Sequence, residues 1–368
     1  MTLNLANRCI GSHRRRPSRR GPSRLLVAPV VALLLVGGAC SSDDGAGTSA
    51  STTEPTADRV AVVAKLIDEV VVAANVDAAE RAEAFGDAID DACAAPDEAN
   101  LAAARAALSE AWAAWEATDS FDIGPVMERR SASVVAYRVD TAKVDAALAD
   151  TPPVDAQTVR NRTGSGLRGY GAAEHLLVTD PAAYDTPARC DYLSAVAEVI
   201  VEETGIIAEW WTDGFDGAPP YRETATGSGD GALSATDVID SLVNMQISQL
   251  EAESKLFSAV VQAGQATPID LPVAELFTLA AKVDGIVNVY SQLGELLDPE
   301  LTATIDSQAA ALSGLLAPSA GEPTETQPDK VDVEKIATAI DELRATIATE
   351  VVSALDVTIS FSENDGDS

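Results

Sequence analysis

The residues with the clearest chemical potential lie in the stretch from Gly166 to Val178. It contains Glu174 and His175, and His175 is the only histidine that remains once the N-terminal leader described below is removed. Tyr170, Glu174 and Leu177 recur at helical spacing, so the carboxylate shares a helix face with apolar residues. An isolated buried carboxylate is costly, so this acid must be protonated, paired or bound to a cation.

Two interpretations of Glu174 stay open from the sequence. One is a structural ion pair with Arg168 or another arginine. The other is a ligand or metal position in a cleft between helices. Because carboxylates alone suffice for hard cations such as Fe³⁺ or Ca²⁺, the second interpretation extends to other acids and to neighbouring groups. We list as candidate ligands Glu174, His175, Glu116, Asp119 and Asp122, with Tyr170 and Arg168 supporting them.

Residues 1–39 have the pattern of a lipoprotein signal peptide. Seven arginines precede an apolar run at 25–36, and small residues follow up to Cys40. Segment 37–40 resembles the lipobox of bacterial lipoproteins, whose cysteine is acylated, although Gly37 stands where leucine is preferred. We expect Cys40 to anchor an exported protein on the extracytoplasmic side of the cell membrane, with 40–57 as a flexible tether. A plain secreted protein is the alternative.

The charge balance excludes some partners. The chain has 25 basic and 58 acidic residues, and removing the leader's arginines takes the net charge from −33 to about −40. Nucleic acid and anionic lipid head groups are therefore poor partners. The acidity is compatible with cation binding, but an acidic solvated surface explains it equally well.

The cysteines point to an oxidising compartment. Cys9 lies in the leader and Cys40 is the expected lipid site, which leaves Cys93 and Cys190. Two cysteines in an exported domain most often pair, so we predict a disulfide between them. Neither has a second cysteine or a histidine at metal-ligand spacing.

From residue 58 onward the pattern is all-α. Apolar residues recur every three and four positions, alanine is abundant, and strict alternation is nearly absent. We expect helices over 60–74, 77–95, 99–118, 126–149, 158–178, 190–211, 233–264, 273–297, 300–316 and 331–355. Gly, Pro and Ser mark 212–232 as the longest irregular segment. It predicts two helical-bundle lobes, 58–211 and 233–368, on either side of this linker.

Four segments, in this order, resemble the imelysin-like family of exported bacterial proteins. The central one is the run Gly169 to Leu177. The others are Trp112-Ala113-Ala114-Trp115 with 121–125, the run 188–193, and the tail 359–367. The resemblance implies two helical lobes with a cleft between them. It also implies an association with metallopeptidase activity or with iron-regulated uptake.

The family's hallmark is Gly-x-His-x-x-Glu on a helix, where the histidine and the glutamate can reach one metal ion. Laid onto this chain, Gly169 and Glu174 match, but Gly171 stands at the histidine position. A catalytic zinc site usually needs three protein ligands. His175 either swings inward in place of the missing histidine or only packs and hydrogen-bonds nearby.

The sequence thus favours a lipid-anchored binding protein that captures iron, another divalent or trivalent cation, or a small ligand between the lobes. It would deliver this ligand to a membrane transport component. A metallopeptidase-like protein and a non-catalytic surface scaffold are the alternatives. No catalytic residue is assigned, because the metallopeptidase motif lacks its histidine.

Overall fold

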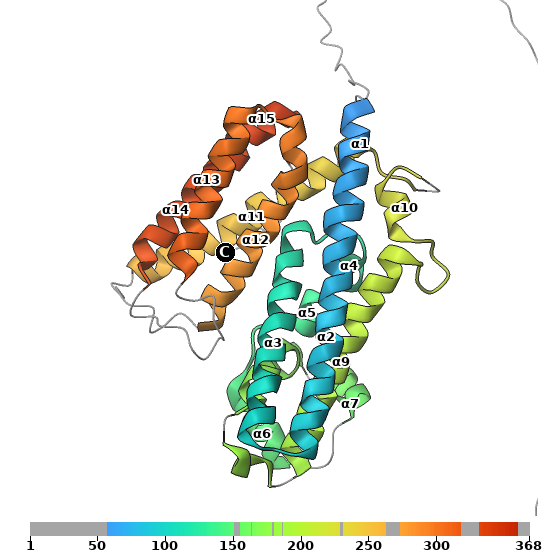
Figure 1. Ribbon diagram of the computed structural model, residues 1–368, viewed down its shortest axis with the longest axis vertical. Coiled ribbons are helices and arrows are strands. Elements are labelled where there is room, and N and C mark those ends of the chain that lie inside the picture. The colour runs from blue at the N-terminus through green and yellow to red at the C-terminus, as the bar shows by residue number, and fades with distance from the viewer. Residues whose placement is uncertain are drawn as a thin grey trace, which may run out of the picture. The chain divides into compact units, whose positions relative to one another are not determined.

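The computed structural model describes residues 57–150, 155–162, 164–178, 180–185, 187–228, 231–262, 273–317 and 331–359. All of them belong to one structural unit, residues 53–368. Helices account for every regular element in these ranges, which confirms the all-α prediction (Figure 1). None of the helices in these ranges is long and apolar enough to span a membrane. The predicted signal peptide, Cys40 and the predicted tether up to residue 56 lie outside the described residues.

Three long helices form the first group. Helix α1 (Ala57–Leu66), the π-helical turn η1 (Ile67–Val72) and α2 (Ala73–Ala94) follow one another without a break. The separation expected near residue 75 was therefore wrong: the π turn absorbs the change of register and keeps its apolar side chains buried. Helices α3 (Glu98–Thr118) and α9 (Pro187–Thr212) pack against α2. Asp97 caps α3 by accepting a hydrogen bond from the Asn100 backbone N–H.

Short helices connect α3 to α9. They are η2 (Asp119–Phe121), α4 (Pro125–Arg129), α5 (Ala132–Val135), α6 (Thr141–Asp150), α7 (Ala156–Arg162), η3 (Ser165–Leu167), α8 (Tyr170–Leu176) and η4 (Pro181–Tyr184). The continuous helices expected over 126–149 and 158–178 were wrong. Arg130, at φ 57°, ends α4 in the left-handed region, and residues 136–140 form a non-helical link before α6.

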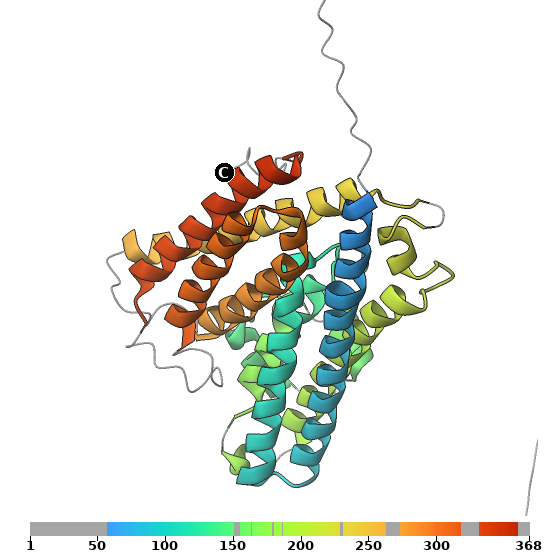
Figure 2. The same ribbon diagram turned by 45° about the horizontal axis from the view of Figure 1, so that its top comes forward.

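The second group follows α10 (Tyr221–Ala225). It contains α11 (Ala235–Gln262), α12 (Val273–Leu293) with η6 (Gly294–Leu296), α13 (Pro299–Leu316), α14 (Val333–Thr346), the π turn η9 (Ile347–Val351) and α15 (Val352–Leu355). Asp298 and Asp332 cap α13 and α14 through their side chains. Helix α14 packs beside α11 and α13 (Figure 2). The boundary expected at 212–232 stays a prediction.

Helix α12 brings the two groups together by packing along α3, while α1 contacts both α11 and α12. Gly285 permits the close approach, because a Cβ atom there would lie 2.1 Å from the backbone oxygen of Ala117. At the same junction, Ser120 Oγ donates to the Lys282 backbone oxygen over 2.9 Å. Gln249 of α11 donates to the Asp119 backbone oxygen. The end of α3 is thus fixed against two helices of the second group.

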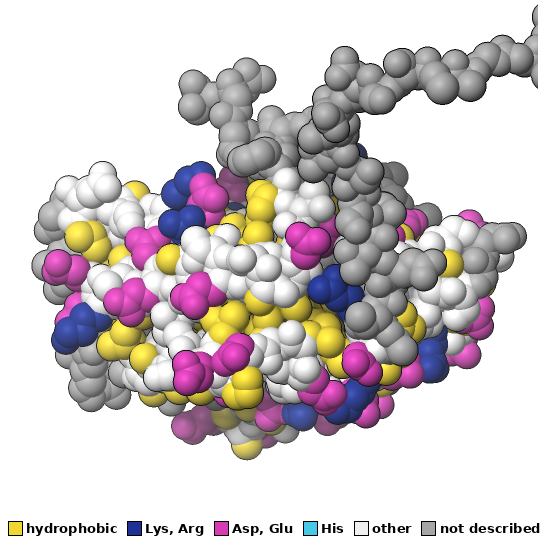
Figure 3. All heavy atoms as spheres, turned by 90° about the horizontal axis from the view of Figure 1, so that it is seen from above, with side chains coloured by type: hydrophobic (Ala, Val, Ile, Leu, Met, Phe, Trp, Pro, Cys, Tyr) yellow, Lys and Arg dark blue, Asp and Glu magenta, His cyan; other side chains and the backbone are white. Residues whose placement is uncertain are grey.

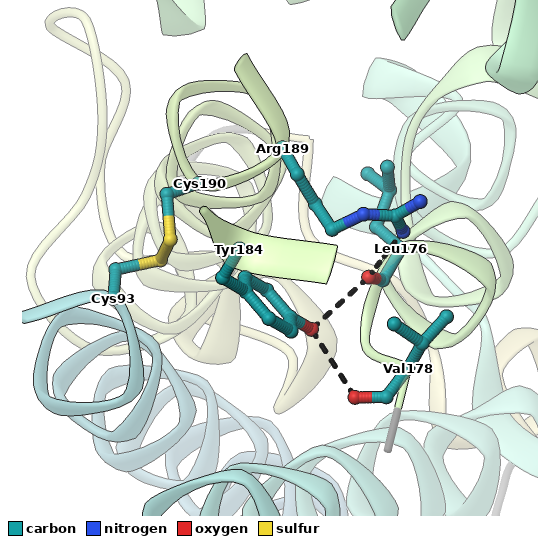
Figure 4. The surroundings of a disulfide bond; sticks show 6 residues. All are labelled: Cys93, Leu176, Val178, Tyr184, Arg189 and Cys190. Carbon is teal, nitrogen blue, oxygen red and sulfur yellow. Dashed lines mark hydrogen bonds between the residues drawn. A yellow bond between two sulfur atoms is a disulfide. The ribbon is translucent and has the colours of Figure 1, made fainter. Parts of the chain in front are cut away.

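The predicted disulfide between Cys93 and Cys190 is present and joins the end of α2 to the start of α9 (Figure 4). The Cα atoms lie 5.6 Å apart, within the usual range for a disulfide. Beside it, the Tyr184 hydroxyl and the Arg189 guanidinium both donate to the Leu176 backbone oxygen. The disulfide thus fixes α2 to α9, and the Arg189 contact holds the end of α8 against α9.

Acidic side chains are spread over the visible face of the molecule among basic, apolar and neutral ones (Figure 3). This distribution is typical of a solvated acidic surface. The candidate acids Glu116, Asp119, Asp122 and Glu174, in contrast, are buried or partly buried.

Candidate functional site

Helix α8 carries the central stretch and is placed by Gly169. This glycine has φ 80°, and a Cβ atom there would lie 2.3 Å from the Val135 backbone oxygen. Only glycine lets the chain turn into α8 this close to the end of α5. The first residue of the helix, Tyr170, is buried and stacks on Trp112, with ring centroids 6.0 Å apart and planes 8° from parallel. The stacked pair fixes α8 against α3.

A cavity of about 380 Å³ lies between α3, α8, α12 and the link after α5. Glu116 and Glu174 both line it, so the structure brings these two predicted site residues to one space. Its lining residues are Trp112, Glu116, Ala136, Tyr137, Arg138, Val139, Thr141, Gly171, Glu174, Thr278 and Lys282. Both helical groups therefore contribute to its wall.

Glu174 is partly buried in this wall, and the described residues offer its carboxylate no hydrogen bond or ion pair. Burial raises the pKa of Glu174, and the nearby His175 opposes that shift only in part. Among the described residues, neither Arg168 nor another arginine forms the ion pair with Glu174 that the first interpretation expects; the Arg168 guanidinium donates to the Arg160 backbone oxygen over 2.6 Å.

His175 does not join the cavity. Its Nε2 lies 2.8 Å from Asp145 Oδ1 of α6, and neither residue lines the cavity. The histidine therefore hydrogen-bonds to the neighbouring short helix, as the second of the two sequence interpretations expects. Tyr170, the other supporting candidate, has a buried hydroxyl without a hydrogen-bond partner among the described residues. Burial raises its pKa.

Lys282 also lines the cavity and forms ion pairs with two of the predicted acids, Glu116 and Asp119, and with Glu253. Its Nζ is 2.9 Å from Glu253 Oε1, 3.2 Å from Asp119 Oδ2 and 3.7 Å from Glu116 Oε2. Trp112 Nε1 also donates to Glu116 Oε1 over 2.9 Å. We call Glu116, Asp119, Asp122 and Glu253 the acidic cluster. It is contributed by α3, η2, the residue after η2, and α11.

The acidic cluster has more carboxylates than its one lysine can neutralise. Desolvation raises the pKa of Glu116 to about 7, against the opposing effect of Lys282. Desolvation also raises the pKa of Asp122 well above its usual range, assisted by the negative charge of Asp119 and a hydrogen bond with that carboxylate. Burial therefore favours the protonated form of Asp122. The charge of Lys282 is shared chiefly by Asp119 and Glu253.

A metal ion implied by the Gly-x-His-x-x-Glu motif does not fit these residues. At position 171 a Cβ atom would lie 3.1 Å from Val139 Cβ, so a side chain enters only if Val139 moves. Glu116, which lines the cavity, and the neighbouring Asp119 already pair with the Lys282 ammonium. Within the described ranges, no three His, Cys, Asp or Glu residues form a group that could hold a metal ion.

The sequence reasoning missed Lys282 and Glu253. A lysine in the largely apolar stretch from Leu276 to Val283 was the available signal, because a charge on an apolar helix face requires a buried partner. Which acid would meet it could not be read from the helix itself. Glu253 lies on a different helix, α11, and is 8% exposed.

A third group of charges lies on α4, α7 and α9. Arg129 donates to both oxygens of Glu203, Nε to Oε1 over 2.9 Å and Nη2 to Oε2 over 2.8 Å. Ser131 Oγ donates to Oε1 over 2.7 Å, and Arg160 reaches Oε2 at 3.3 Å. These contacts keep the pKa of Glu203 below its usual value in spite of burial. This is a satisfied structural network.

Comparisons with known proteins match most of the chain. The family model described as Imelysin matches residues 71–349. A curated protein of Synechococcus elongatus, iron-regulated protein A, is 29% identical over 204 residues, which are 51% of this chain and 51% of that protein. The chain therefore spans about half the length of this curated relative.

Two solved structures share the fold. An imelysin-like protein from Psychrobacter arcticum superposes with a TM-score of 0.61 at 16% identity, over 83% of this chain and 97% of that one. A putative iron-regulated protein A precursor from Parabacteroides distasonis gives a TM-score of 0.64 at 18% identity, with the same coverage. At these identities the likeness supports the fold alone.

Proposed function

Since this chain belongs to the imelysin family, we propose that it is an exported binding protein of an iron-regulated uptake system. Its ligand is a small molecule or chelate held in the cavity beside Glu174. The curated relative is named iron-regulated protein A, and that name supports the link to iron. A membrane transport component is the proposed recipient of the ligand.

The observation that carries this proposal is the Glu174 carboxylate, which faces a cavity of about 380 Å³ without a hydrogen bond from the described residues. A carboxylate in such a position is stabilised by a ligand that brings positive charge or hydrogen-bond donors. The apolar part of the wall, Trp112 and Val139, suits the organic part of such a ligand.

A bare metal ion is less well supported than a small ligand. One carboxylate supplies at most two oxygen ligands, whereas Ca²⁺ takes six to eight. Iron bound here would have to arrive with other ligands already in place, as in a chelate. The metallopeptidase alternative has the same difficulty, because zinc hydrolysis needs a metal held by about three protein groups and a water.

Glu174→Gln tests this proposal. We expect the substitution to weaken binding of a ligand that pairs with the carboxylate by about tenfold or more, because a charged hydrogen bond contributes about 1.5–3 kcal/mol. The thermal midpoint without ligand should stay the same or rise, since the amide removes an uncompensated charge. Ferric citrate, Fe³⁺, Zn²⁺, Ca²⁺ and methylammonium serve as probes, and the readouts are thermal shift and elemental analysis.

The matched control is Glu110→Gln. Glu110 lies on the same helix as Glu116, but it is exposed and pairs with Arg81. This variant should bind the probes as the unmodified protein does. An equal loss in both variants would indicate only a general effect of net charge. If Glu174→Gln binds every probe as tightly as the unmodified protein does, the proposed site is contradicted.

Cys40→Ser tests the proposed membrane anchor. We expect the variant to leave the membrane fraction and appear in the soluble fraction, because its thiol is the proposed site of acylation. Its circular dichroism should be unchanged, since every described helix begins after residue 56. Fractionation followed by immunoblotting gives the result. A variant that stays in the membrane fraction would contradict acylation at this residue.

A further inference from the structure

The Lys282 ammonium lies among three carboxylates of the acidic cluster. Its three carboxylate neighbours come from α3, η2 and α11, so the lysine of α12 is enclosed by both helical groups. The lysine side chain is 19% exposed and that of Glu253 is 10% exposed. These side chains form a site for one positive charge in the wall of the cavity.

The distances suit an ammonium rather than a metal ion. The Nζ–oxygen separations of 2.9, 3.2 and 3.7 Å are those of charged hydrogen bonds and ion pairs, whereas Ca²⁺ binds oxygen at about 2.3–2.6 Å. With the ammonium in place, the carboxylate oxygens surround Nζ at separations longer than those of a metal site.

Two carboxylate oxygen atoms of the acidic cluster could accept a further hydrogen bond or contact a cation. Glu253 Oε2 and Asp122 Oδ1 are buried, and neither has a hydrogen-bond partner among the described residues. The other oxygen of Glu253 contacts Lys282, so its free oxygen belongs to the same carboxylate. A divalent cation would use such oxygens, because it accepts more carboxylate ligands than a three-donor ammonium.

We infer that Lys282 supplies the positive charge of the acidic cluster and that its presence excludes metal ions from this part of the cavity. Removal of its charge opens a site for one hard divalent cation, with Asp119 and Glu253 as principal ligands. The chain thus replaces an exchangeable cation with a covalently attached one. This inference does not depend on the ligand proposed for Glu174.

The test is Ca²⁺ titration of Lys282→Met, followed by calorimetry and by tryptophan fluorescence, since Trp112 donates to Glu116 in the cluster. Methionine keeps the length of the side chain and removes its charge. We expect one Ca²⁺ to bind at least about 100-fold more tightly than to the unmodified protein, because a nearby positive charge is lost. Adding Glu253→Gln to this variant should abolish the gain.

The matched control is Lys335→Met, which removes an exposed lysine paired with Asp332 at 2.8 Å. It should gain no Ca²⁺ affinity. If Lys282→Met is unfolded without metal, recovery of its helical circular dichroism with Ca²⁺ supports the inference. Three results would overturn it: a folded variant that binds no Ca²⁺, a variant that stays unfolded in Ca²⁺, or tight Ca²⁺ binding at Glu253 in the unmodified protein.

Discussion

Arg129→Met is expected to lower the free energy of unfolding by about 3 kcal/mol, because it leaves a buried carboxylate without its main partner. The side chain of Glu203 is 1% exposed, while that of Arg129 is 24% exposed. Without the arginine, Glu203 keeps Ser131 and the more distant Arg160. Urea denaturation at pH 7 measures the change.

The decrease in the free energy of unfolding caused by Arg129→Met should depend on pH in a defined direction. The folded pKa of Glu203 lies below its usual 4.5. The ion pair therefore contributes fully above that value and is lost as the pH falls through the folded pKa. The difference between the unmodified protein and Arg129→Met should narrow below about pH 4.5. A difference that is constant from pH 7 to pH 3 would contradict the assignment to this ion pair.

Arg222→Met is the control for this experiment. Arg222 pairs with Asp68 at the same 2.8 Å distance, but the two side chains are 46% and 44% exposed. An exposed pair of this kind contributes about 1 kcal/mol or less. A loss as large as that of Arg129→Met would show that burial is not the cause.

Removal of the disulfide is expected to lower the free energy of unfolding by an amount comparable to that of Arg129→Met. The double variant Cys93→Ser, Cys190→Ser should lose about 4 kcal/mol, because the bond closes a loop between residues 97 apart and restricts the unfolded chain. Chemical denaturation of the variant against the oxidised protein gives the value. Helix content at low denaturant should be retained, since the core includes both helices that the bond joins.

The reduced unmodified protein is the control, and its denaturation curve should coincide with that of the double variant. Intact-mass analysis must first show that the two thiols are absent in the oxidised protein. Two free thiols would contradict the bond itself. A stability loss well below 1 kcal/mol would show that the reduced unfolded chain is already restricted near these residues.

The amino-acid sequence by itself determined the helical class, most of the long helices and the disulfide. Helical periodicity is local, so the apolar face of α3 or α11 can be read along one segment. Where helices are short the same reasoning failed. The left-handed Arg130 and the π turn at 67–72 have no strong signal of their own, because tertiary packing overrides weak local preferences there.

The candidate site was predicted only in part. The acids at 116, 119, 122 and 174 were all named from the sequence as possible carboxylate ligands of a hard cation. What only the tertiary structure decided is their partners. Glu174 faces a cavity without a partner among the described residues, His175 meets Asp145, and Asp119 meets Lys282. The physical reason is that periodicity shows which residues share one helix face, whereas the packing of separate helices selects which charges that face meets.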